Sequence, residues 1–316
     1  MKKLVLSIGA ALCIYGMVVF PVSGQSLDTS ALNDKMGSAL DTISNAVTEA
    51  TSQMNLTAEA YIGKLFPSLP AHFMVGLSAS TTIIDMNPLK DAIVTGGVDS
   101  ASVSGVPHTL VLPAWAIQAR LGGIVLPFDI GGFVSFSIPI SGLSIDLSKM
   151  SDAQIKMIIK NTSAGLDLRY AILQGKGRWP KISLGGGYFY VNKNYTFAIA
   201  DGDNSLDTTF TIKTHALYVQ MQISKQFAFI APYLGARALF TKEANSFSWD
   251  AHIESSTPKD YADTASFGHN FEASRVQPQI FAGIGFLPPF GQITLGCQYN
   301  PRLNLWTVSV HGGFRM

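Results

Sequence analysis

Charged residues are scarce in this chain. Only 14% of its 316 residues are Asp, Glu, Lys or Arg, against roughly 25% in an ordinary soluble domain. The 22 basic and 21 acidic residues nearly cancel, which excludes the basic surface typical of nucleic-acid binding. We therefore expect no nucleic-acid partner. Together with a mean hydropathy of +0.25, the low charge indicates a membrane protein.

Cysteine is nearly absent, and its placement predicts export without disulfides. Residues 1–24 read as a cleavable signal peptide, with Lys2 and Lys3 before an apolar run of 17 residues and a small-residue exit at Gly24. An uncleaved anchor is the alternative, because 17 residues lie near the lower limit for spanning a membrane. Cleavage removes Cys13 and leaves Cys297 alone. A single cysteine excludes an internal disulfide framework.

Apolar runs suited to further spanning helices are also missing. Residues 277–301 carry no charge, but they contain four prolines and four glycines, which would break a helix in lipid. Alternation with a period of two recurs instead, as in residues 73–83, 115–122, 163–172 and 182–190. One face of each stretch is apolar and the other is small or polar. In this reading, residues 277–301 are two strands joined by a turn at Pro288-Pro289-Phe290.

The spacing of the alternating stretches separates a barrel from a soluble β-sandwich. We expect strands near 71–84, 113–123, 130–141, 162–174, 181–193, 209–224, 227–241, 276–287, 291–299 and 304–316. Long links at 85–112, 142–161, 194–208 and 242–275 alternate with short turns, as in transmembrane barrels. The predicted fold is all-β, a transmembrane antiparallel up-and-down barrel of about ten strands, with eight to fourteen allowed. A short helix is expected at 151–160.

The chain resembles bacterial outer-membrane β-barrel proteins. The resemblance rests on the signal peptide, the alternating strands and the last segment, NLWTVSVHGGFRM, which carries Trp306, Val308, Val310, Phe314 and Met316 on one face. It implies insertion into the outer-membrane lipid by the barrel assembly machinery, which reads such a final strand. A helical segment before the barrel also looks, more loosely, like the long-chain fatty-acid transporter family, although the Asn-Pro-Ala motif of that family is missing near the N-terminus.

The segment between the signal peptide and the barrel forms a unit of its own. In residues 25–70, apolar side chains recur at three- and four-residue steps and predict a helix with a narrow apolar stripe, formed by Leu32, Met36, Leu40, Ile43, Val47, Ala50 and Met54. This helix rests in the periplasm or enters the barrel as a plug. Residues 71–316 then form the barrel.

Candidate functional residues lie on the inward face of the predicted strands. Small residues dominate that face, so the interior should hold water, a ligand or another part of the chain. Its charged positions, Arg120, Asp167, Arg169 and Arg237, are the lumen-facing candidates that would gate a pore. Two functions remain open. One is a channel or transporter for a small or hydrophobic solute, and the other is a surface-exposed or structural barrel whose loops bind host or partner molecules.

Residues suited to catalysis are few. Asp250 and His252, with Asp260, Asp263 and His269 nearby, fall in the longest predicted link, where outer-membrane proteases carry acids and histidines. Such residues are ordinary in solvated loops, and their spacing fits no metal site. We expect no enzyme, no catalytic residues, no metal and no cofactor.

Overall fold

The structure is a computed structural model of the chain. It describes residues 45, 48, 51, 72–85, 87, 108–122, 128–136, 144–145, 154–175, 178–201, 204–254 and 262–315. The predicted signal peptide at 1–24 and the predicted apolar stripe lie outside the described residues. No helix in the described part of the chain is long and apolar enough to cross a membrane.

Eleven strands follow one another along the described chain. They are β1 (His72–Asp85), β2 (Thr109–Gly122), β3 (Phe128–Phe136), β4 (Ser144–Ile145), β5 (Gln154–Gln174), β6 (Lys181–Asp201), β7 (Asn204–Ser224), β8 (Ile230–Glu254), β9 (Ala262–Phe286), β10 (Gly291–Asn300) and β11 (Leu305–Arg315).

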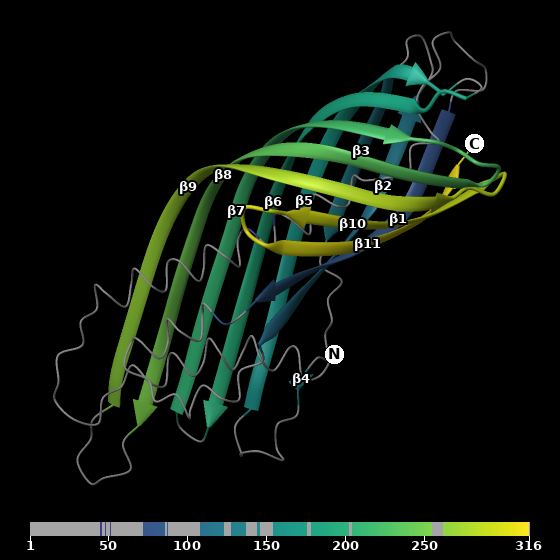
Figure 1. Ribbon diagram of the computed structural model, residues 1–316. Helices are drawn as coiled ribbons and strands as arrows, with labels where there is room; N and C mark the ends of the chain where they lie inside the picture. Colours follow the sequence, from purple (N-terminus) through teal and green to yellow (C-terminus); the bar gives the residue numbers. More distant parts are fainter. Residues whose placement is uncertain are drawn as a thin grey trace.

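The sheet closes on itself (Figure 1). The first long strand, β1, pairs antiparallel with both β2 and β11. The ring is completed where β3 pairs with β5, from Phe128 opposite Tyr170 to Phe136 opposite Thr162. The two-residue β4 pairs with β5 through Ser144 and Ile145 and is not part of the ring. The result is a closed ten-stranded antiparallel barrel, which confirms the predicted fold class.

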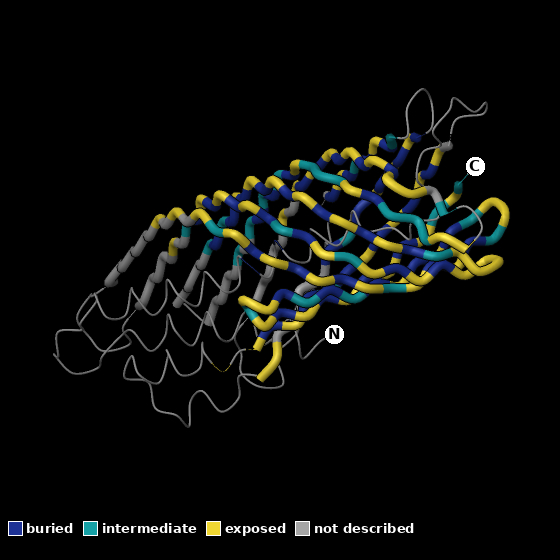
Figure 2. Tube along the Cα trace, turned by 45° about the horizontal axis from the view of Figure 1, so that its top comes forward, coloured by how far each residue is buried: buried dark blue, intermediate teal, exposed yellow. Residues whose placement is uncertain are grey.

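Exposed and buried residues alternate along the described parts of the barrel strands (Figure 2). Large apolar residues are exposed on the outside of all ten strands, as with Leu77 at 66%, Leu166 at 68% and Leu217 at 60%. A soluble monomer rarely exposes a contiguous apolar surface of this extent. A closed barrel has no free edge, so every strand can satisfy its backbone in lipid. We call this outward-facing apolar surface the apolar belt, and lipid is the environment that it fits.

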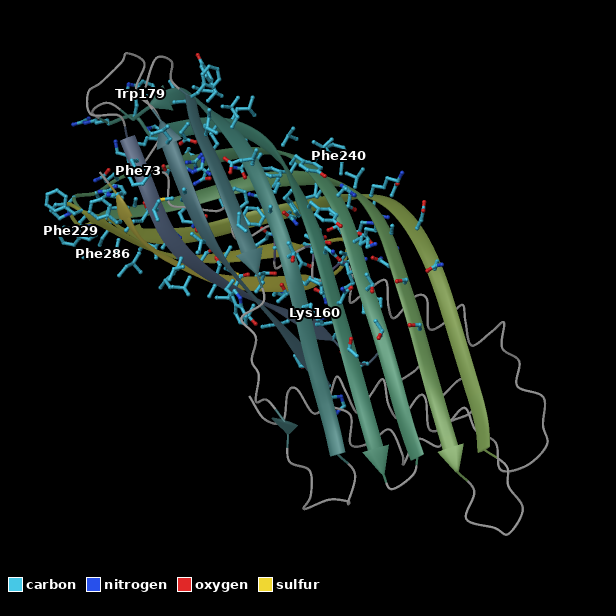
Figure 3. All side chains as sticks on the ribbon, turned by 180° about the vertical axis from the view of Figure 1, so that it is seen from behind. Phe73, Lys160, Trp179, Phe229, Phe240 and Phe286 are labelled. Carbon is cyan, nitrogen blue, oxygen red and sulfur yellow. The ribbon has the colours of Figure 1, made fainter. Side chains whose placement is uncertain are left out.

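The apolar belt has two recognisable limits. One limit is the end of the barrel where the short links join the strands. Exposed aromatic side chains lie there, among them Trp179 and Phe229 (Figure 3). Such aromatics are typical of a membrane–water interface. At the other end, a line of directly paired residues closes the belt: Leu166, Tyr188, Leu217, Phe240 and Val276. The outward residues of the next line are Ala164, Tyr190, His215, Lys242 and Ser274. On β9 the belt runs over residues 276–286, which matches the ~9–11 residues of a transmembrane strand.

Strands β5 to β9 are much longer than the membrane requires. Three of them have 21 residues and two have 25. At about 3.3 Å per residue, the longest approach 80 Å, well beyond a hydrocarbon core of about 30 Å. Their far ends therefore continue past the apolar belt as a five-stranded extension (Figure 1). On this side the barrel wall is taller than it is at β10, β11, β1, β2 and β3.

The long strands correct several sequence-based predictions. The expected loops at 194–208 and 242–275 are mostly strand, since β6 and β7 remain paired out to Asp201 opposite Asn204, and β8 and β9 out to Glu254 opposite Ala262. The expected loop at 142–161 contains β4 and the first part of β5, which begins at Gln154, so the helix predicted at 151–160 is wrong from Gln154 on. Isoleucines in that stretch favour a strand, and pairing with β6 fixes them in it.

The barrel interior contains large side chains set against the small ones that were expected to dominate the inward face. Phe189 and Phe281 are at most 1% exposed. A Cβ atom added to Gly165 would overlap the Phe133 ring, and one added to Gly235 would overlap the Phe281 ring. The inward glycines therefore make room for aromatic and arginine side chains of neighbouring strands. Part of the space that small residues leave is filled by the barrel wall itself.

Adding one methyl group at Gly235 should destabilise the barrel by about 1–3 kcal/mol. In Gly235→Ala, the new Cβ would overlap both the Phe281 ring and, at 2.6 Å, the carbonyl oxygen of Met221. Gly312→Ala is the matched control, because no atom lies within 4 Å of its added Cβ. Urea unfolding of the two refolded variants measures the difference, and equal midpoints would contradict the close contact.

Candidate functional site

Four buried charged residues of β2, β3 and β5 form one connected network inside the barrel. Arg120 donates from Nη1 to Asp129 Oδ1 at 2.5 Å and from Nη2 to Asp167 Oδ2 at 3.0 Å. Arg169 donates to the two oxygens of Asp129 from Nε at 2.8 Å and from Nη2 at 2.7 Å. All four residues are at most 4% exposed. We call them the charge network.

Strand register explains how the charge network assembles. Asp129 lies directly opposite Arg169, and Gly131 lies between Arg120 on one side and Asp167 on the other. A Cβ atom at Gly131 would lie 2.5 Å from Arg120 Nη2. The absence of a side chain at this one position lets the guanidinium of Arg120 cross β3 and reach Asp167. The bidentate geometry between Arg169 and Asp129 is the strong form of such a charged hydrogen bond.

Arg237 of β8 lies on another part of the wall. It donates from Nε at 3.1 Å and from Nη2 at 2.6 Å to Gln220 Oε1. Its guanidinium carbon lies 4.4 Å from the centre of the Tyr218 ring and 5.8 Å from that of Phe281. Both distances fit a cation–π contact. Arg237 is 3% exposed, so amide and aromatic groups enclose it within the barrel.

The structure places all four predicted lumen-facing residues on buried, inward positions and joins three of them. Arg120, Asp167 and Arg169 belong to the charge network. Along the sheet, β6 and β7 separate Arg237 from Arg169, but the two positive charges are close enough to interact electrostatically. Asp129, which holds the two arginines together, was missed because the sequence around it reads as the end of a turn. The alternation along β3 was the available signal, because Asp129 shares its face with Gly131 and Ser135.

Three residues of the predicted N-terminal helix are buried, and two of them contact the inside of the barrel. Asn45, Thr48 and Thr51 are helical and at most 1% exposed. Gln277 of β9 donates from Nε2 to Asn45 Oδ1 at 2.8 Å, and Thr48 Oγ1 donates to Oγ1 of Thr214 on β7 at 3.5 Å. Thr214 and Gln277 both occupy inward-facing positions. A polar face of this segment, with residues at three-residue steps, therefore contacts the lumen wall.

The residues considered for catalysis lie on strands rather than in a loop. Asp250 and His252 belong to β8, and Asp263 and His269 belong to β9, while Asp260 lies outside the described residues. Within the part of the chain that the structure describes, no group of three or more His, Cys, Asp or Glu side chains is arranged to hold a metal ion.

Comparisons with known proteins give only distant similarities. No protein-family model matches the chain, and no curated protein matches it significantly. Among solved structures, the translocator domain of the autotransporter NalP from Neisseria meningitidis has a TM-score of 0.40 at 9% identity, covering 91% of this chain and 96% of that one. The outer membrane protease OmpT from Escherichia coli has 0.35 at 10% identity, covering 83% and 97%. A major outer membrane protein from Thermus thermophilus has 0.33 at 10% identity, covering 78% and 100%.

Proposed function

We propose that this protein is an outer-membrane channel for small polar solutes, restricted by its own N-terminal segment. The contact of Asn45 and Thr48 with inward-facing Gln277 and Thr214 is the observation that carries the proposal. In the proposed channel, these contacts hold polar groups of the N-terminal segment in the path of the solute. In the proposed channel, residues 26–66 form the plug, and the charge network with Arg237 lines the remaining passage. The channel requires neither catalysis nor a cofactor.

The chemistry of the interior favours a small polar solute over a hydrocarbon. Buried amide and hydroxyl side chains line the inner wall in large number, among them Gln118, Gln220, Gln222, Gln277, Gln279, Gln292, Gln298, Thr294 and Thr307. A long hydrocarbon, the cargo implied by the looser resemblance to fatty-acid transporters, would exchange water for a wall rich in polar groups and so gain little from burial. A hydrated solute fits such a wall better.

The outer face supports the proposed location. In a bacterial outer membrane the apolar belt would contact lipid, and the aromatic residues near the short links would lie at the periplasmic interface. Trp306, Val308, Val310 and Phe314 are all outward-facing on the last strand, β11. This is the arrangement expected of a final strand that the barrel assembly machinery reads, according to the family resemblance. Export through a cleavable signal peptide is part of the same proposal.

The second candidate is a surface barrel that binds host or partner molecules. The extension formed by β5 to β9 favours it, because a strand of 25 residues reaches far beyond the membrane. A channel alone has no need of such height. The two functions differ in their dependence on the N-terminal segment, because a surface barrel does not need to conduct when that segment is displaced.

Locking the plug should hold the channel closed, and removing it should open it. In a Cys297→Ser background, Thr48→Cys with Thr214→Cys should form a disulfide on oxidation, since the native hydroxyl oxygens lie 3.5 Å apart. Planar-bilayer recordings should show low conductance in the oxidised protein and a rise on reduction or on deletion of residues 26–66. Thr48→Cys with Leu217→Cys is the control, because Leu217 faces outward.

Two results would separate the candidates. Disulfide formation without any conductance, even after deletion of residues 26–66, would reject the channel and leave the surface barrel. Equal cross-linking to the inward and outward cysteines would show that Thr48 does not occupy the lumen, and the plug would then be wrong.

A further inference from the structure

A cluster of basic and aromatic side chains lies on the outward face, directly beyond the apolar belt. It comprises Lys213 and His215 of β7, Lys242 of β8, and Tyr188 and Tyr190 of β6, and we call it the rim cluster. The two lysines, the histidine and Tyr188 are exposed, and Tyr190 is half-buried. Tyr188 itself is the last belt residue of its strand, so the cluster begins where the apolar surface ends.

Strand pairing brings the three basic residues together. His215 lies directly opposite Lys242 on one side and Tyr190 on the other. Lys213 is two positions farther along β7 on the same face, so it is a diagonal neighbour of Lys242, at roughly 7–8 Å. Long lysine side chains reach across such a distance. One anionic group can therefore contact both ammonium groups and the imidazole at once.

The imidazole of His215 is held in place by the two tyrosines. The Tyr188 hydroxyl and His215 Nδ1 share a hydrogen bond of 2.6 Å. The ring centre of Tyr190 lies 4.8 Å from that of His215, and the ring centre of Tyr188 lies 6.1 Å from it. When the hydroxyl donates to Nδ1, the neutral ring carries its proton on Nε2. That proton is then available to a ligand on the outer surface.

The lysines of the rim cluster have no acidic partner in the described part of the chain. The nearest acid by register is Glu272 of β9, outward-facing and diagonal to Lys242 on the side away from His215. No ion pair of 4.0 Å or less joins either lysine to a carboxylate among the described residues. The cluster is therefore a positively charged surface beside lipid, with two ammonium groups free to take a ligand.

We propose that the rim cluster binds the phosphate groups of a phosphorylated glycolipid of the lipid A type in the adjacent leaflet. The rim cluster lies at the edge of the apolar belt, which corresponds to the depth of the lipid headgroups, where basic residues bind anionic lipid. A phosphate monoester carries about −1.5 to −2 charges at neutral pH, which matches the charge of the two lysines, and the imidazole adds a hydrogen-bond donor. The tyrosine rings supply the amphipathic surface typical of this interface. The inference rests on the membrane placement of the barrel and is independent of channel activity.

Titration of the refolded full-length chain with lipid A, in nanodiscs of phosphatidylcholine, tests the proposal. Binding to Lys213→Ala/Lys242→Ala should be about 30-fold weaker than to the unmodified protein, since a lysine near a lipid surface contributes about fivefold. Tyr188→Phe should weaken binding by a smaller factor, because it frees the imidazole. Lys160→Ala is the matched control: Lys160 is an exposed lysine of β5, farther along the extension (Figure 3), and its removal should leave affinity unchanged.

Three results would overturn the proposal. One is unchanged lipid A binding by the double variant, and another is an equal loss in Lys160→Ala. The third is equal affinity for fully dephosphorylated lipid A or for phosphatidylglycerol, which would remove the phosphorylated glycolipid as the ligand. Gel mobility before and after heating verifies that each variant is folded. If the double variant does not fold, the single variants Lys213→Gln and Lys242→Gln carry the same test, with about fivefold losses expected.

Discussion

Replacing Asp129 with alanine is expected to destabilise the barrel by about 3–5 kcal/mol. The carboxylate accepts hydrogen bonds from both Arg120 and Arg169 and is itself fully buried. Its removal leaves two buried arginines beside one carboxylate, Asp167, and so a surplus of one buried positive charge. Reversible urea unfolding of the barrel in lipid vesicles, followed by tryptophan fluorescence, measures the free energy of unfolding.

The stability of a second variant, compared with that of Asp129→Ala, distinguishes charge imbalance from simple loss of packing. Asp129→Ala/Arg169→Met removes one acid and one base, and it leaves Arg120 paired with Asp167 at 2.8 Å. The double variant should lose less unfolding free energy than Asp129→Ala alone, because no surplus positive charge remains. Asp85→Ala, at an exposed strand end, should change stability by less than about 0.5 kcal/mol. A double variant less stable than Asp129→Ala would contradict the charge argument.

The membrane-spanning part of the fold was predictable because lipid imposes a strict pattern on it. The strands predicted near 181–193 and 291–299 correspond to β6 and β10. They were predictable because lipid contacts one face of each strand and the lumen lies on the other, which produces the alternation. The same physics explains the failure beyond the membrane. In the extension, water replaces lipid on the outer face, so alternation fades and residues 194–208 read as a loop. Pairing between β6 and β7 keeps them extended regardless of that pattern.

The candidate site was only partly predictable for a different reason. Alternation within each strand predicts that Arg120, Asp167 and Arg169 face inward. Their contacts depend on the register between strands, which cannot be predicted from a single sequence. Gly131 illustrates the point. From the sequence, a small inward residue indicates empty space, but in the structure the guanidinium of Arg120 occupies the space beside it.

Placing arginine at Leu295 is expected to destabilise the barrel by about 2–4 kcal/mol, the cost of a cation near the bilayer midplane. Leu295 is 54% exposed and lies directly opposite Ile284 and Val310, which are also outward-facing, so it sits within the belt. In water, a polar change at so exposed a strand position would cost less than about 0.5 kcal/mol. Unfolding of the variant in phospholipid vesicles therefore reports directly whether this face contacts lipid.

Ala244→Arg supplies the matched control for depth. Ala244 is exposed and outward-facing on β8, but it lies two register lines beyond the end of the belt, opposite Lys213 and Glu272. Arginine at that position should cost at most about 1 kcal/mol, as near a membrane interface. Both variants introduce the same side chain on the same outward surface. The difference between their losses of unfolding free energy therefore follows from the depth of each site. Small and equal losses would mean that water, and not lipid, covers the outer face of the barrel.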